Sequence, residues 1–193
     1  MRKLSLILLT LFFAVYLMAQ DSAGKHQYVG VAKCKTCHKT EKQGAQLAKW
    51  EASEHAKAYK TLMSEEAVKI AKEKGIAKAP HEASECLKCH VAGYSVDTSL
   101  KADSFVKEDG VQCESCHGAG ADYRKKTIMK SREQSIKNGM AAIAVDDGSA
   151  EKMCKTCHNQ ESPTFKSFNF KEMWEKIAHP VPEGGGGDES EGE

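Results

Sequence analysis

The sequence predicts a mostly α-helical fold with much irregular structure. Apolar residues recur at helical spacing in several short stretches, and no run of alternating apolar and polar residues indicates a β-sheet. Only 7% of the 193 residues are aromatic, so the chain by itself has little material for a hydrophobic core. The pentad Cys-x-x-Cys-His occurs four times, and we expect the fold to be organised around the groups that these pentads hold.

Four stretches favour helix: 40–62, 64–74, 149–158 and 169–178. In the second stretch Ser64 is the predicted N-cap, and Gly75 is expected to end the helix. In the last stretch Asn169 is the predicted N-cap, with Glu172 three residues on. The remaining long connections are expected to be irregular or to hold short helices: 91–112 and 121–148.

The two ends of the chain differ in character from the rest. A short basic start, an apolar run too short for a comfortable bilayer span and the small residue Ala19 predict an export signal over residues 1–19. An uncleaved anchor is the competing interpretation. A short segment, 20–27, then leads into a single expected domain over 28–181, and the glycine-rich acidic tail 182–193 is predicted to be disordered. We therefore expect a periplasmic protein.

Every cysteine belongs to a pentad, and a histidine follows each second cysteine directly. The cysteines are Cys34, Cys37, Cys86, Cys89, Cys113, Cys116, Cys154 and Cys157, and the histidines are His38, His90, His117 and His158. Disulfides in an exported protein or two zinc ions could use the cysteines, but neither explains the fixed histidine. Covalent haem attachment does, because two thioethers hold the porphyrin edge while the adjacent imidazole binds the iron. The pentads therefore predict four haem c groups in a multihaem cytochrome c.

Four covalently bound haems would also explain the shortage of core residues. The macrocycles would form the main apolar mass and tie distant segments together, as metals or disulfides do in small scaffolds. We therefore expect the apoprotein to be largely unfolded. A formal charge of +1 without a basic patch gives no indication of nucleic-acid binding. The expected partners are redox proteins that dock weakly, and any membrane association is expected to be through them.

Four histidines outside the pentads match the number of remaining iron positions: His26, His55, His81 and His179. His55 lies in the predicted helix 40–62, where small Ala52 and Ala56 leave room for a flat macrocycle, and we interpret it as a ligand rather than a surface histidine. His179 follows the last predicted helix and is also interpreted as a ligand, although it lies off that helix's apolar face. For His26 and His81, ligation and an exposed polar role remain equal alternatives.

The segments "YVGVAKCKTCHK", "WEASEHAKAY", "CLKCHVAGY" and "GVQCESCHGAGADY" resemble the exported tetrahaem cytochromes of ammonia-oxidising bacteria, electron acceptors of hydroxylamine oxidoreductase. The resemblance runs from about Tyr28 to His179. It implies a mostly helical protein with closely packed haems. It also implies that His55 binds the fourth haem opposite His158, that His179 binds the third opposite His117, and that the second haem, on His90, is five-coordinate.

The chain departs from that family at the first haem. The family has a ligating histidine shortly after the third pentad, whereas no histidine lies between His117 and His158 here. The first haem is therefore open or uses a residue from elsewhere: Met129, Lys125, Lys126, His26 or His81. Methionine would raise the potential relative to a second histidine, although a core position in a short helix is the commoner role of a methionine. His81 could equally close the second haem.

Three functions are compatible with these features. The leading hypothesis is electron transfer, because two axial imidazoles keep iron low-spin in both oxidation states and axial ligands and burial set its potential. A second is reduction of nitric oxide or a related nitrogen compound at an open haem. That reaction needs a proton source, and no general acid is identifiable, although Glu85 and His81 lie near Cys86 in the sequence. A third is a haem filament in which His26 or His81 binds a neighbour's iron, permitted by the short segment around His26.

Overall fold

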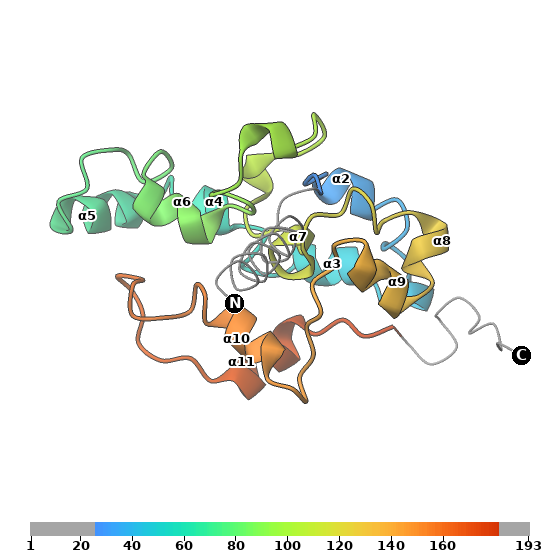
Figure 1. Cartoon of the computed structure of the whole chain (residues 1–193). Coiled ribbons are helices and arrows are strands. Elements are labelled where there is room, and N and C mark those ends of the chain that lie inside the picture. Colours follow the sequence, from blue (N-terminus) through green and yellow to red (C-terminus); the bar gives the residue numbers. More distant parts are fainter. Residues whose placement is uncertain (1–25, 182–193) are drawn as a thin grey trace, which may run out of the picture.

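The computed structural model describes residues 26–181 (Figure 1). The predicted export signal and acidic tail lie outside the described residues. Within 26–181 short helices are joined by irregular segments, and strand-like pairing is confined to one isolated bridge between Tyr28 and Lys101. The predicted fold class, mostly α with much irregular structure, is confirmed.

The helices are short, and α3 (Gln46–Glu51) and α7 (Cys113–His117) lie between the outer ones. Figure 1 shows α4, α5 and α6 on one side of the molecule, α8 and α9 on the opposite side, and α10 and α11 below them. In chain order the elements are α2 (Val31–Cys34), η1 (Glu41–Gln43), α3 (Gln46–Glu51), α4 (Ala58–Thr61), α5 (Glu65–Glu73), α6 (Ser84–His90), η2 (Thr98–Leu100), η3 (Lys107–Asp109), α7 (Cys113–His117), α8 (Lys126–Met129), α9 (Arg132–Lys137), α10 (Ser149–Cys154) and α11 (Phe170–Ile177).

Two of the predicted helices form with the predicted caps. The Ser64 side chain accepts a hydrogen bond from the Ala67 N–H at the start of α5, and Gly75 follows that helix with a positive φ of 69°. The Asn169 side chain accepts from the Glu172 N–H at the start of α11. A third predicted helix begins at Ser149 but ends at Cys154, so the last pentad runs out of α10 into turns.

The single helix predicted over 40–62 is wrong. Gly44 (φ 97°) and Ala45 (φ 48°) adopt left-handed conformations that separate η1 from α3. Further on, the His55 carbonyl accepts hydrogen bonds from the N–H groups of Val111 (3.1 Å) and Ala58 (3.2 Å), so the chain is in turns at His55 rather than in a helix. His55 is therefore positioned by a contact with a distant segment and not by the face of a continuous helix.

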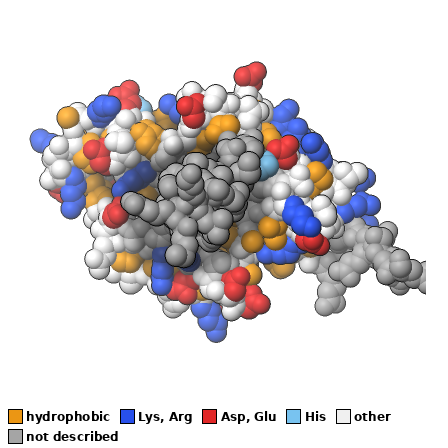
Figure 2. Space-filling view, in the orientation of Figure 1, with side chains coloured by type: hydrophobic (Ala, Val, Ile, Leu, Met, Phe, Trp, Pro, Cys, Tyr) orange, Lys and Arg blue, Asp and Glu red, His pale blue; other side chains and the backbone are white. Residues whose placement is uncertain are grey.

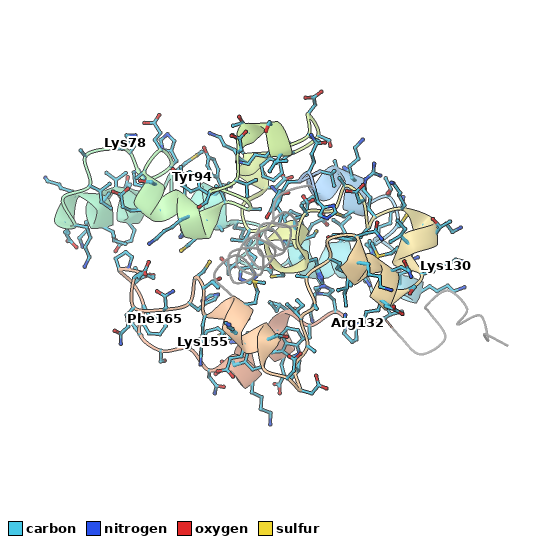
Figure 3. The ribbon with its side chains drawn as sticks, in the orientation of Figure 1. Lys78, Tyr94, Lys130, Arg132, Lys155 and Phe165 are labelled. Atoms are coloured by element: carbon cyan, nitrogen blue, oxygen red, sulfur yellow. The ribbon has the colours of Figure 1, made fainter. Side chains whose placement is uncertain are left out.

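The protein's own hydrophobic core is small. The main cluster consists of Tyr59, Leu62, Leu87 and Val91, and Tyr94 packs against it beside α6 (Figure 3). The hydrophobic residues that are buried within 26–181 are Val29, Val31, Tyr59, Leu62, Ala71, Ala83, Leu87, Val91, Ala92, Tyr123 and Ala150. Four of these are alanines, which bury little apolar area each. The chain alone therefore supplies far less core than a domain of this length normally has.

The surface carries charges of both signs. On the face shown in Figure 2, basic and acidic side chains are interspersed around the periphery. Several form exposed ion pairs within a helix, such as Lys137 with Glu133 and Lys176 with Glu172, and pairs of this kind contribute little to stability. Across residues 26–181, no helix combines the length and apolar character needed to cross a bilayer.

Candidate haem-binding site

Two pairs of histidines have their imidazoles close together. The imidazoles of His55 and His158 lie 6.0 Å apart between ring centroids, with an interplanar angle of 62°. The imidazoles of His117 and His179 have the same separation and the same angle. Each pair joins a pentad histidine to a histidine from outside the pentads. Identical geometry in two unrelated sequence contexts indicates a shared requirement rather than incidental packing.

The spacing of both pairs fits one metal ion between two imidazoles. Metal–imidazole nitrogen bonds are about 2 Å long in well-characterised sites, and with about 1 Å more from nitrogen to ring centre two axial rings have centroids roughly 6 Å apart. The observed 6.0 Å matches that value. The residues present therefore fit a haem iron held from both sides, as the resemblance implies for these two pairs.

Three of the paired imidazoles lie in surroundings that keep them neutral. Burial, together with His179 and His38 nearby, lowers the pKa of His117 to about 4. Burial also lowers the pKa of His55, with a further contribution from His158, and burial lowers the pKa of His158 itself. Only a neutral imidazole can bind a metal, so all three are in the ligating form at neutral pH.

Hydrogen bonds to backbone carbonyls fix which ring nitrogen of His90 and of His179 is free to bind a metal. Nδ1 of His90 lies 2.7 Å from the Ala58 carbonyl oxygen, and Nδ1 of His179 lies 2.7 Å from that of Ile177. A carbonyl oxygen only accepts, so Nδ1 carries the proton in both rings and Nε2 keeps its lone pair. Such a hydrogen bond on the far nitrogen is the usual way in which a metal-binding histidine is oriented. His158 is held differently, because its ring stacks on Phe168 at 4.8 Å.

The eight cysteines are all unpaired, and several lie close to a cysteine of another pentad. Cys34 and Cys113 lie close enough for their thiols to act on each other, which raises the pKa of Cys34 and lowers that of Cys113. Burial and the neighbouring Cys157 raise the pKa of Cys89 to about 11. The attachment points of the first and third pentads are therefore neighbours, and so are those of the second and fourth.

The competing uses of the cysteines gain no support from the structure. None of the eight forms a disulfide. Residues 26–181 contain no group of three or more histidine, cysteine or acidic side chains arranged to hold a metal ion by themselves. Each pentad instead presents two cysteines and one histidine in a single turn of chain, which is the arrangement that covalent haem attachment uses.

The other candidate ligands lie outside the two imidazole pairs. His26 donates from Nδ1 to Oδ2 of Asp122 at 2.6 Å, and its ring lies against Gly139, where a Cβ atom would come within 2.5 Å of the imidazole. His81 is half-buried in the turn between α5 and α6, and Met129 is half-buried at the end of α8. Because His26 is bound to Asp122 of its own chain, its imidazole is not presented to a neighbouring molecule, and the filament hypothesis gains no support from it.

Three residues with roles at the site were not predicted from the sequence. Phe168 stacks on His158, Asp122 binds His26, and Glu114 is a buried carboxylate inside the third pentad. Glu114 was detectable, because the positions between the two cysteines of the other pentads hold only Lys, Thr and Leu. The other two contacts join segments far apart in the chain and leave no local pattern.

The fold and the four pentads define a multihaem c-type cytochrome that carries four haem c groups. Residues 33–118, which include the first three pentads, match the family described as "Cytochrome c554 and c-prime". The chain is also 32% identical, over 158 residues, to the protein named cytochrome c-554 of Nitrosomonas europaea. This match covers 76% of the chain and 64% of the relative's length. The chain is thus similar in sequence to cytochrome c-554 and spans a little under two thirds of that relative's length. No solved structure matches it.

Proposed function

We propose that this protein carries electrons between redox partner proteins. The observation that carries the proposal is the two imidazole pairs, His55 with His158 and His117 with His179, each at 6.0 Å. Bound haem supplies reversible one-electron chemistry at its iron. The chain's contribution is to hold two imidazoles in place on a low-spin iron, so that little has to move when an electron arrives.

The proposed binding residues follow from the pentads and the pairs. The eight pentad cysteines form the thioethers, and His38, His90, His117 and His158 are the first axial ligands. His158 pairs with His55 at the fourth haem, and His117 pairs with His179 at the third. The adjacent attachment cysteines Cys34 and Cys113, and likewise Cys89 and Cys157, support close packing of the haems.

For the first haem we propose His26 as the second ligand. The structure brings His26 to Asp122, five residues after the third pentad. This is the region in which the resemblance implies a ligating histidine that the present chain lacks. The Asp122 carboxylate holds Nδ1–H and leaves Nε2 free, as carboxylates do for metal-binding histidines.

His26→Ala should therefore remove one low-spin signal from the EPR spectrum of the oxidised holoprotein and add one high-spin signal. The control is Gln27→Ala, which removes only a hydrogen bond from the neighbouring side chain to the Ser99 carbonyl and should leave the spectrum unchanged. An unaltered count of low-spin irons in His26→Ala would show that the first haem uses Met129, a lysine or no protein ligand.

For the haem on His90 we propose a five-coordinate iron, as the resemblance implies. A reductase at this haem gains no support from Glu85, the nearest acidic side chain in the sequence. Glu85 is fully exposed, and hydrogen bonds from its own backbone N–H and from Ser84 lower its pKa. A carboxylate of that kind is a poor proton donor at neutral pH.

We also propose that the protein works in the periplasm after loss of residues 1–19, with 28–181 as one haem-dependent domain.

The electron-transfer proposal is tested by a reductive titration of the purified holoprotein. We expect it to take up four electrons reversibly and to return them to an exogenous acceptor. Rapid reoxidation by nitric oxide with turnover, but not by a protein or dye acceptor, would favour the reductase instead.

A further inference from the structure

The third pentad contains a buried carboxylate. Glu114 is only 2% exposed. Its Oε2 accepts from the Gly30 N–H (2.7 Å) and its Oε1 from the Gly120 N–H (2.6 Å), while both oxygens lie within 3.1 Å of the Val29 N–H. Glu114 therefore fastens the segment before the first pentad, and the loop after the third, to α7.

This hydrogen bonding requires the ionised form of Glu114. Both carboxylate oxygens are occupied as acceptors of backbone N–H groups, and a protonated acid would need an acceptor for its own O–H. None of the ion pairs formed within residues 26–181 includes Glu114. The side chain is thus a buried negative charge held by backbone dipoles, without a salt-bridge partner in the described part of the chain.

The charge lies where the first and third pentads meet. Glu114 follows Cys113 directly, and Gly30, whose N–H its carboxylate binds, accepts a hydrogen bond from the Cys34 thiol through its carbonyl at 3.7 Å. The negative charge of Glu114 also acts on Tyr28 and Tyr123. Burial raises the pKa of each tyrosine, and Glu114 raises it further. A buried charge acts strongly on its neighbours because the surrounding medium screens it poorly.

We propose that the negative charge of Glu114 lowers the redox potentials of the haems attached at Cys34/Cys37 and at Cys113/Cys116. Oxidised haem iron carries one more positive charge than reduced iron, so a nearby carboxylate stabilises the oxidised state. The proposal rests on the haem attachment proposed above. It adds that a residue that binds no iron lowers the potentials of these two haems.

The test compares three variants in spectroelectrochemical titrations of the holoprotein. Glu114→Gln removes the charge and should shift two of the four midpoint potentials in the positive direction. Glu114→Asp keeps the charge but shortens the side chain. It should lower the urea midpoint for unfolding while leaving the potentials close to those of wild type. Glu85→Gln removes an exposed carboxylate next to Cys86 and should change neither quantity.

Unchanged potentials in E114Q, or equal shifts in E114Q and E114D, would overturn the proposal. If E114Q does not accumulate as folded holoprotein, E114D still decides, because a shift of two potentials with the charge retained contradicts an electrostatic role. Failure of the underlying haem assignment is distinguished by mass spectrometry of proteolytic peptides. In that case haem would be missing from the peptides that contain Cys34/Cys37 or Cys113/Cys116.

Discussion

Replacing His179 by alanine is expected to convert one of the four irons from low-spin to high-spin. The imidazole of His179 lies 6.0 Å from that of His117, and its Nε2 is the free nitrogen because Nδ1–H is bound to the Ile177 carbonyl. Alanine has no atom that can reach a metal from this position. The iron on His117 would then keep a single imidazole, which gives a weaker ligand field.

The measurement is EPR of the oxidised holoprotein, with the number of high-spin centres counted before and after the change. His55→Ala should likewise add one high-spin centre, and the double variant should add two, because the two pairs are separate. His81→Ala is the matched control, since His81 belongs to neither pair, and it should add none. If His55→Ala and His179→Ala both leave the count unchanged, the pairing proposed for the third and fourth haems is wrong.

Removing the third attachment site is expected to abolish most of the folded structure. In Cys113→Ala/Cys116→Ala no thioether can form at α7, which lies at the junction of several pentads. Cys113 is next to Cys34, and the pKa of Cys116 is raised to about 11 by burial and by the nearby Cys154 and Cys157. Since few side chains are buried within residues 26–181, loss of this haem would leave a void that they cannot fill.

We expect this double variant to lose most of its helical circular dichroism or to fail to accumulate. The matched comparison is Leu62→Ala, which truncates a residue of the main hydrophobic cluster outside the pentads. That change should cost about 2–5 kcal/mol, the usual range for a buried leucine, and should leave four haems attached. A double-cysteine variant that kept native dichroism and unfolded at the same urea concentration as wild type would contradict a haem-built core.

The sequence predicted the fold well where the signals are local. The N-caps Ser64 and Asn169 and the glycine stop at Gly75 act within one turn of chain, and α5 and α11 form with these caps. The helix over 40–62 failed because Ala45 adopts a left-handed conformation and Val111 takes the His55 carbonyl. Neither could be predicted from helical periodicity, because both depend on how distant segments pack.

The candidate site likewise contains residues that local sequence patterns predict and residues that depend on contacts between distant segments. Each pentad is a contiguous pattern whose chemistry is readable from five residues. The partners of His117 and His158 come from other parts of the chain, and the residues alone favoured His55 and His179 as ligands without saying which pentad each would face. That pairing was implied only by the resemblance. The Asp122 contact of His26 was not predictable, because nothing near either residue in the sequence indicates it.

Intact mass spectrometry of the exported protein, combined with its absorption spectrum, tests the central claim most directly. The account predicts the mass of the polypeptide plus four haem groups that denaturation and acid extraction do not remove, together with an intense Soret band. A folded protein with the mass of the bare polypeptide and no Soret band would contradict it.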